Sequence, residues 1–349
     1  MDLKELQENL RKFGLSKYET LVYITLLKGG TLTASEIVEA SGIPHPRLYD
    51  VVSSLERKGL IESKSGRPKK SWCADPEVAL PRFFGKFEKS YKTILDISKE
   101  MYRRTPTSQE KPSVWVVKGR ENVLSKMTDV IKNSKVEILA AIPDLLAERW
   151  GKMFLDRSSN GVSISLVIHP FEKRIENFKE MSERISLRAR EAAGMSVVAA
   201  DNKRCLTCSS KMLAPEYHSE MIYGVFMEDN SGLMQIINDF FFSTLWQHSK
   251  PANEVPVRKV ASFVNVCTAA EYINVLQNLG KKAKISVWGK LLKTGEIVNI
   301  KGHVETTSLE KGVFRTMHVK TSDGKLTSIG GLGATLEDVE AEKILIELS

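Results

Sequence analysis

Three short helical segments, each stopped by glycine, lie between Ser16 and Gly59, and this pattern restricts the fold more than any other feature of the sequence. Ser16 can cap the first segment, and Thr33 with Glu36 has the spacing of a capping box for the second. In the third, apolar residues recur at i, i+3, i+4 and i+7, so one face packs inward and the other stays free. The glycines that end the segments are Gly29 with Gly30, Gly42 and Gly59. The pattern predicts three short helices around a small core.

A basic hairpin is expected after the third helix. Two β-rich runs, 60–63 and 71–74, are separated by a turn that contains Gly66 and Pro68 and no acidic residue. The four cations of this turn are Lys64, Arg67, Lys69 and Lys70. Three helices followed by a basic hairpin are typical of a winged helix-turn-helix domain, whose recognition helix enters the major groove while the wing lies along the phosphates. Residues 1–74 are therefore predicted to bind double-stranded DNA.

The predicted DNA contacts lie on the third helix and on the wing. Arg47 has the length and the bidentate donors to read guanine, and His45 stands at the start of the same helix. Further contacts to bases or phosphates are expected from Tyr49, Ser53 and Ser54, and contacts to phosphates alone from Lys64, Arg67, Lys69 and Lys70. The alternative is a winged helix that docks another protein, with Arg47 merely solvated. The concentration of cations on the wing favours DNA.

One long helix is expected from Asp75 to Arg104. Its apolar residues step by four and three, with Ser98 interrupting the series: Leu80, Phe84, Phe87, Tyr91, Ile94 and Met101. This heptad spacing is that of a coiled coil and predicts that the helix pairs two protomers; the alternative is a single helix packed on its own domain. Residues 105–112 are rich in Pro and Thr and predict a linker. Residues 75–112 are thus assigned to a dimerisation helix and linker, and a higher oligomer stays open.

Two further domains are expected beyond the linker. Between 113 and 250, short β-rich runs alternate with segments of helical period, which is the signature of an α/β domain. Its aromatic-rich stretch 235–247 is expected to fill a core, with stacking on a ligand as the alternative. From 257 to 349 strands dominate, separated by Gly-containing turns, so a small β-rich domain is predicted, either an antiparallel sheet or a half-barrel. The fold class is therefore multidomain, α/β plus α+β.

The composition excludes several classes of protein. Lys and Arg number 51 against 43 Asp and Glu, a net charge of +8 that permits a polyanionic partner. The charged N-terminus does not resemble a signal peptide and no apolar run approaches the length of a membrane span, so a cytoplasmic protein without a membrane partner is expected. Cys205 and Cys208 form a single CxxC motif, and even with His218 the four ligands of a zinc site are missing, so no metal is expected. His169 and His248 are expected to be polar surface or capping residues.

Several stretches together carry a family resemblance. In the N-terminal region they are FGLSKYE (13–19), ASEI (34–37), SGIP (41–44), LYDVV (48–52) and LERKGLI (55–61); farther along they are KGRE (118–121) and GGLGATLED (330–338). With these motifs the chain resembles the archaeal TrmB-like transcriptional regulators over nearly its whole length. The resemblance implies a dimeric, effector-responsive DNA-binding protein with a phospholipase-D-like middle region and a C-terminal sensor domain, and with sugars as effectors in characterised members.

The resemblance also implies where an effector binds. In sugar-binding members the strand equivalent to 331–337 contributes to the ligand pocket, and the matching residues here are Gly331, Gly333, Thr335 and Glu337. Alternate residues of a strand point to one side, and a carboxylate can accept hydrogen bonds from sugar hydroxyls. Because Gly333 and Thr335 are small, Trp288 is expected to supply a platform for a sugar ring from another strand. The alternative is that Gly330 and Gly331 only make a tight turn and that Glu337 is a surface acid.

Catalysis is not expected from the middle domain. A phospholipase-D nuclease needs two His-x-Lys-x4-Asp motifs, one to supply an imidazole nucleophile and the other an imidazole acid. The sequence has neither; the nearest match, His318 with Lys320, has Lys325 where the aspartate is required. Residues 113–250 are therefore expected to form a noncatalytic phospholipase-D-like domain, and no cofactor is expected.

These observations predict a homodimeric, sequence-specific transcriptional regulator, with a repressor as the expected type. Residues 1–74 bind DNA, the helix within 75–112 pairs the protomers, and residues 257–349 sense a small-molecule effector, with a carbohydrate as the first candidate. The alternative is a constitutive architectural protein that coats DNA and carries a vestigial sensor domain. A nuclease that uses the middle domain is the third class.

Overall fold

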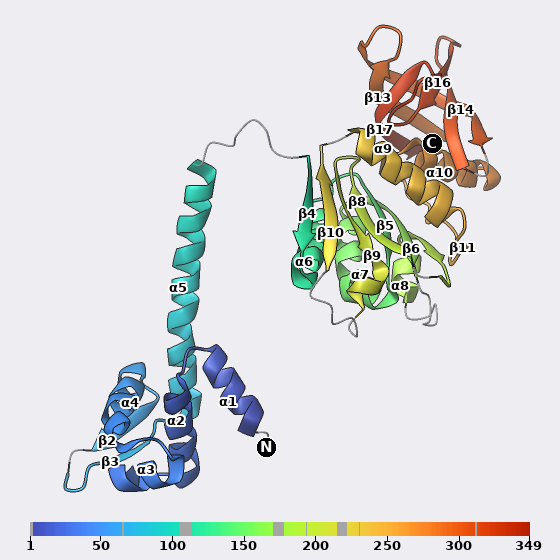
Figure 1. Cartoon of the computed structure of the whole chain (residues 1–349). Helices are drawn as coiled ribbons and strands as arrows, with labels where there is room; N and C mark the ends of the chain where they lie inside the picture. Colours follow the sequence, from blue (N-terminus) through green and yellow to red (C-terminus); the bar gives the residue numbers. More distant parts are fainter. Residues whose placement is uncertain are drawn as a thin grey trace. The chain divides into compact units, whose positions relative to one another are not determined.

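A computed structural model describes residues 3–64, 66–104, 113–169, 178–192, 194–214, 222–229, 231–310 and 313–349. The chain forms two compact units, Met1–Glu110 and Lys111–Ser349 (Figure 1). The predicted linker at 105–112 and His218, which was weighed as a zinc ligand, lie outside the described residues. No described helix is long and apolar enough to cross a membrane.

The first unit has the helices and the wing that the sequence predicts. Its helices are α1 (Leu3–Lys12), α2 (Lys17–Gly29), α3 (Ala34–Ser41), α4 (His45–Lys58) and α5 (Pro76–Arg104), and its strands are β1 (Leu32–Thr33), β2 (Ile61–Lys64) and β3 (Lys70–Cys73). The capping boxes Ser16 with Glu19 and Thr33 with Glu36 are both formed. The strands make a small antiparallel sheet in the order β1-β3-β2. α1 and β1 were not among the elements predicted from the sequence.

The core of the first unit lies where the helical spacing predicts it. The inward residues of α4 are all buried: Leu48, Val51, Val52 and Leu55. They pack with Val22 of α2 and with Leu60, which are fully buried. The N-terminal part of α5 joins this core through Ala79 and Phe83. This packing fixes α4 and the wing on one rigid body.

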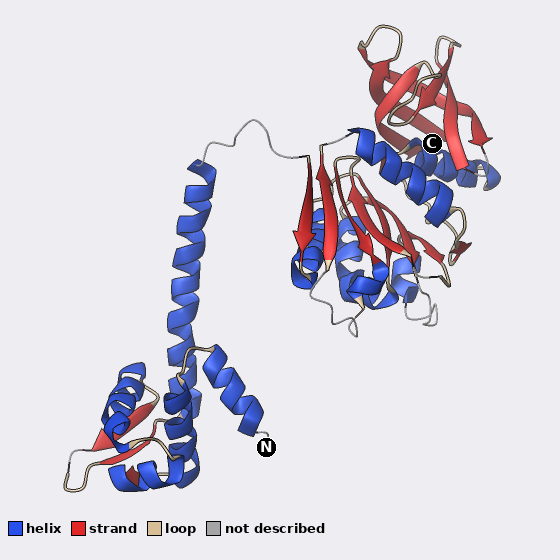
Figure 2. Ribbon diagram, in the orientation of Figure 1, coloured by secondary structure: helices blue, strands red, loops and turns tan. Residues whose placement is uncertain are grey.

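An eight-stranded mixed sheet forms the first part of the second unit. Its strands are β4 (Val114–Lys118), β5 (Glu137–Ile142), β6 (Ser163–Ile168), β7 (Ser186–Ala189), β8 (Met195–Ala200), β9 (Arg204–Ser209), β10 (Tyr223–Glu228) and β11 (Lys250–Pro251), in the order β11-β7-β6-β5-β8-β9-β10-β4. The helical segments are α6 (Arg120–Lys132), α7 (Asp144–Ser159), α8 (Lys179–Ser182), η2 (Ser210–Leu213), α9 (Ser231–Phe240) and the π-helical η3 (Phe241–Trp246). β5, β6 and β7 run parallel in this sheet (Figure 2), and β5 and β6 are buried on both faces.

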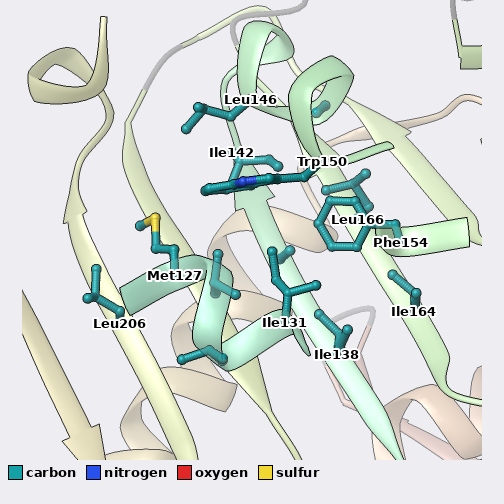
Figure 3. Packing of buried hydrophobic residues seen from close by; sticks show 14 of the residues in the cluster. Met127, Ile131, Ile138, Ile142, Leu146, Trp150, Phe154, Ile164, Leu166 and Leu206 are labelled. Carbon is teal, nitrogen blue, oxygen red and sulfur yellow. The ribbon is translucent and has the colours of Figure 1, made fainter. Parts of the chain in front are cut away.

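Two hydrophobic clusters cover the two faces of this sheet. On one face Met127 and Ile131 of α6 and Trp150 and Phe154 of α7 pack on the strands (Figure 3). On the other face α9 and η3 supply most of the apolar side chains, and Phe241 and Trp246 are buried there. The aromatic-rich stretch therefore fills a core, as expected.

A closed ring of strands forms the last part of the second unit. This part contains β12 (Val260–Phe263), α10 (Val266–Asn278), β13 (Ala283–Leu291), β14 (Ile297–Glu310), β15 (Val313–Thr321), β16 (Leu326–Gly330) and β17 (Val339–Leu348). The order is β12-β17-β13-β14-β15-β16, and β16 also pairs with β17. This parallel pairing, which joins Ile329 to Val339, closes the sheet into a barrel rather than the predicted half-barrel.

His169 of the middle sheet is placed differently from the expectation, and the strand position of the CxxC motif decides whether its two cysteines can share a ligand. His169 is fully buried at the end of β6, not on the surface, and burial lowers its pKa to about 4. Cys205 and Cys208 both lie in β9, three positions apart, so they point to opposite faces and join different hydrophobic clusters. These two cysteines therefore do not face a common ligand.

Candidate DNA interface and effector pocket

The free face of α4 carries most of the predicted base contacts. His45, Arg47 and Ser53 are exposed, and Tyr49 is 61% exposed beside the ring of His45. Ser54 differs from the expectation because its hydroxyl donates to Oε1 of Glu19 at 2.7 Å, inside the domain. The structure adds Arg57, which is exposed one turn beyond Ser53. The face thus offers two guanidinium groups to a groove of DNA.

The wing concentrates positive charge on a two-stranded ribbon. Lys64 and Lys70 are directly opposite each other in the β2–β3 pairing. Like charges in this arrangement destabilise a sheet, and a phosphate between them removes the penalty. Arg67 is exposed, whereas Lys69 forms an ion pair of 3.3 Å with Glu56 of α4. Lys64, Arg67 and Lys70 are thus exposed on the wing, and Lys69 ties the wing to α4.

Glu19 anchors α4 to the rest of the domain. It is 6% exposed, and its Oε1 accepts from Lys58 and Ser54 while its Oε2 accepts from the backbone N–H of Ser16, each at 2.7 Å. Burial pushes the pKa of this carboxyl up, but the hydrogen bonds from these three residues outweigh burial and hold the pKa at about 2. The carboxylate therefore fixes the orientation of the recognition helix at neutral pH.

A cavity of about 380 Å³ opens between α9 and the end of β16 in the second unit. The predicted effector residues Gly331, Gly333, Thr335 and Glu337 all line it. Trp288 does not line it: this side chain lies on β13 beneath the ammonium of Lys343. The lining residues that were not predicted from the sequence are Gln235, Asn238, Asp239, Phe242, Asn265, Val266, Cys267, Arg315, Leu332, Ala334 and Leu336.

The glycine-rich segment forms a loop, which corrects the expectation of a strand at 331–337. β16 ends at Gly330 and β17 begins at Val339. A Cβ on Gly330 would lie 2.7 Å from the carboxyl carbon of Glu337, so the missing side chain makes room for that carboxylate. Gly333 has φ of 78° and donates its N–H to Glu340. The loop, and not strand alternation, turns these residues toward the cavity.

Polar side chains from both parts of the second unit meet at this cavity. Arg315 of β15 donates to Asp239 of α9 at 2.6 Å, and Thr316 donates to Glu337 at 2.9 Å. Asn238 of α9 is 9% exposed; its Nδ2 donates to Asn202, but its Oδ1 has no partner among the described residues. The carboxylates of Asp239 and Glu337, which line the cavity, can accept further hydrogen bonds from a ligand. The cavity is therefore suited to a small molecule rich in donors.

Family models match three successive regions of the chain. Residues 10–77 match the model described as sugar-specific transcriptional regulator TrmB. Residues 113–252 match transcriptional regulator TrmB, EBD N-terminal subdomain, and residues 258–349 match TrmB/TrmBL1, EBD C-terminal subdomain.

Among curated proteins, the chain is 31% identical to the HTH-type sugar sensing transcriptional regulator TrmBL1 of Pyrococcus furiosus, over 98% of each chain. It is 27% identical to the DNA-binding HTH-type transcriptional repressor TrmBL2 of Thermococcus kodakarensis, over 55% of this chain and 78% of that one. Among solved structures, TrmBL2, described as an archaeal chromatin protein, aligns with a TM-score of 0.41 and 22% identity over 71% of this chain and 99% of its own. The phospholipase D family member Nuc of Salmonella typhimurium aligns with a TM-score of 0.34 and 17% identity over 41% and 100%. With family models over all three regions and a relative matched along its whole length, the chain belongs to the TrmB family of transcriptional regulators.

Proposed function

We propose that this regulator binds operator DNA as a homodimer, represses transcription, and leaves the operator when a neutral sugar fills the cavity at 331–337. One observation carries the proposal: the exposed face of α4 lies on the same rigid domain as a wing whose Lys64 and Lys70 face each other. In this arrangement α4 supplies base contacts and the wing supplies phosphate contacts. The middle sheet is proposed to be noncatalytic, because the sequence lacks the paired His-x-Lys-x4-Asp motifs.

The dimer is proposed to form through the part of α5 (Pro76–Arg104) that runs from Phe87 to Met101. Phe87, Tyr91, Ile94 and Met101 follow heptad spacing, and each is at least 47% exposed in the single chain. Exposed apolar residues at this spacing are buried when two such helices pair. A symmetric dimer would present its two α4 helices to half-sites about 34 Å apart. An effector that changes the separation of the two helices would then weaken binding.

The effector is proposed to be an uncharged, hydroxyl-rich molecule. Among the residues that line the cavity, two carboxylates, Asp239 and Glu337, face the single guanidinium of Arg315. An anionic ligand would meet repulsion there, whereas hydroxyl groups find acceptors. The full-length relative TrmBL1 is named a sugar sensing regulator, which supports the same class.

The DNA-binding part is tested with Arg47→Ala and Lys70→Ala as a matched pair. Arg47→Ala should relax preference at one operator position by about 1–3 kcal/mol, because a bidentate base contact is lost. Lys70→Ala should weaken all sequences alike and reduce the slope of log affinity against log salt by about 1, because one phosphate contact is lost. Binding to single-base operator variants at several salt concentrations measures both. Unchanged selectivity in Arg47→Ala would overturn its recognition role.

Footprinting of the wild-type protein separates a regulator from the architectural alternative. A regulator protects one bounded, palindrome-like site, because two recognition helices fit two half-sites. A coating protein protects extended DNA regardless of sequence, because phosphate contacts carry no sequence information. Extended protection at all concentrations would replace the proposed function with the architectural one.

The effector part is tested by a thermal-shift screen of neutral mono- and disaccharides. A bound sugar stabilises the second unit by about 2.7 kcal/mol at a hundredfold excess over its Kd. Glu337→Ala should abolish this shift while DNA binding without effector stays intact. Glu342→Ala is the control, because Glu342 is a half-exposed acid of β17 that pairs with Lys290 and does not line the cavity. Loss of the shift in both variants would contradict the assignment of Glu337.

A further inference from the structure

Glu137 is a fully buried acid that joins the two parts of the second unit. It is the first residue of β5, in the middle sheet. Its Oε2 accepts from the backbone N–H groups of Val264 and Asn265, each at 2.8 Å, and from Nδ2 of Asn265 at 3.2 Å; its Oε1 accepts from the hydroxyl of Thr268. All four donors belong to the loop before α10 and to the first turn of α10. The carboxylate thus lies at the N-terminus of a helix that belongs to the other part of the unit.

The carboxylate takes one half of a capping-box arrangement at α10, because it accepts the backbone N–H of the N-cap residue Asn265. Asn265 occupies the N-cap position, but its side chain makes no capping bond to the helix. The backbone donors at the start of a helix need acceptors, and a negative charge there is favoured by the helix dipole. Burial raises the pKa of Glu137 to about 7, while its four hydrogen-bond donors act in the opposite direction. A side chain from a distant strand therefore holds the N-cap residue and the Thr268 hydroxyl at the start of this helix.

The turn between β8 and β9 also holds the loop before α10. The β8–β9 turn contains Asp201 and Asn202, both with positive φ, at 57° and 54°. Asp201 accepts the backbone N–H groups of residues 135–137 and so holds the start of β5. Asn202 donates its Nδ2 to the carbonyl of Val264 at 3.0 Å. The loop at 264–265 is thus held by the side chains of Glu137 and Asn202, and Asp201 next to Asn202 holds the strand that carries Glu137.

This loop is also a wall of the cavity. Asn265, Val266 and Cys267 line the cavity, and Asn238 on the opposite wall donates to Asn202. The hydrogen bonds therefore run without a break from the cavity-lining Asn238 through Asn202 to the loop, and from the loop to Glu137. A ligand that moves either wall has to move this network.

We infer that Glu137 is a positioning residue for the effector pocket, which fixes the Asn265–Cys267 wall and transmits a displacement of that wall to β5. This inference rests on the proposed function of the pocket. Burying an ionisable residue stabilises a fold less than burying a well-packed apolar residue, so a buried acid points to a specific structural role. Here that role is to hold the pocket wall. Glu137 touches no ligand and acts only through the loop and helix that it holds.

Labelling of Cys267 in the full chain tests this role without an identified effector. Cys267 is in the first turn of α10 and is only partly exposed at the cavity, and burial raises the pKa of its thiol to about 12, so N-ethylmaleimide should react slowly. Glu137→Gln offers one acceptor oxygen in place of two, so the first turn should open more often and labelling of Cys267 should accelerate by about tenfold. Mass spectrometry of the peptides separates Cys267 from the buried Cys205, whose labelling reports global unfolding.

Glu271→Gln is the matched control. Glu271 is also an acid between the two parts, bonded to Arg188 at 2.7 Å and to the indole N–H of Trp246 at 2.9 Å, but it does not line the cavity. It should leave the ratio of Cys267 to Cys205 labelling within about twofold of wild type. Thr268→Val removes one donor and keeps the carboxylate, so it should give an intermediate acceleration even if Glu137→Gln does not fold. Equal ratios in all the variants would overturn the inference.

Sugars provide a second arm that separates this inference from the proposed function. Maltose and the other neutral sugars of the thermal-shift screen should slow labelling of Cys267 in the wild type and bind about tenfold more weakly to Glu137→Gln. If no sugar protects Cys267 while Glu137→Gln still accelerates labelling, the effector assignment fails and the positioning role stands. If sugars protect Cys267 equally in the wild type and in Glu137→Gln, the positioning role fails and the effector assignment stands.

Discussion

Ile94→Glu should convert the proposed dimer into monomers and weaken binding to a two-half-site operator by about 100-fold or more, which corresponds to about 2.7 kcal/mol. Ile94 is 63% exposed in the single chain and lies between Tyr91 and Met101 in the heptad series. Pairing of two α5 helices would bury it against its own copy, so the variant places two carboxylates in one apolar seam. The penalty for burying an ion is several kcal/mol, and it applies twice in a symmetric dimer.

Sedimentation velocity and operator binding measure this effect together. Thr93→Glu is the matched control, because it adds the same charge at an exposed position outside the a and d positions of the heptad. Ser98→Leu should have the opposite effect, since it fills the interruption in the seam. A dimer that survives Ile94→Glu with unchanged affinity would show that α5 does not pair the protomers, and would leave α5 as a helix of its own domain.

The N-terminal domain could be predicted from sequence because its determinants are local. Thr33 and Glu36 are three residues apart and form the predicted capping box, and the inward face of α4 follows from helical spacing alone. The second role of Glu19 could not be predicted in this way. Its bonds to Ser54 and Lys58 join α2 to α4, and no local pattern marks such a pair. For the same reason Ser54 was expected to contact DNA.

The effector pocket could be predicted only on one side. The resemblance identified Gly331 to Glu337, and the structure places those residues at a cavity. The opposite wall comes from α9, where Asn238 and Asp239 precede the aromatic residues that fill a core. Two polar residues at the edge of an apolar segment do not show in the sequence which distant residues they face. Trp288 has the chemistry of a sugar platform, but its position on β13 directs it elsewhere, and only the register of the barrel decides that.

Buried polar residues were the least predictable part of the chain. His169 and Glu137 both sit at the ends of strands that are buried on both faces, and sequence alone does not show which polar residue at a strand end is covered by a second element. Glu137 is covered by α10, which lies far along the chain. The barrel that contains α10 is closed by a parallel pairing of β16 with β17, a long-range feature that turn signals do not encode.

Glu19→Gln should lower the stability of the first unit at pH 7 by about 2–3 kcal/mol. The glutamine has one acceptor oxygen where the carboxylate uses two, so either Lys58 and Ser54 or the N–H of Ser16 loses its acceptor. The pKa of Glu19 is about 2 in the folded chain against 4.5 for the free side chain. Because the folded pKa is the lower one, the stabilisation is complete above pH 4.5 and is lost as the pH falls from 4.5 toward 2.

Hydrogen exchange of the α4 amides in the full chain measures this effect without interference from the second unit. The difference in opening free energy between wild type and Glu19→Gln should be largest at pH 7 and should shrink steadily below pH 4.5, after correction for intrinsic exchange rates. Glu36→Gln is the matched control, because Glu36 closes the neighbouring capping box but is exposed to solvent. It should change the protection of α3 rather than α4. A difference at α4 that does not depend on pH would show that packing of the side chain, and not its charge, anchors the recognition helix.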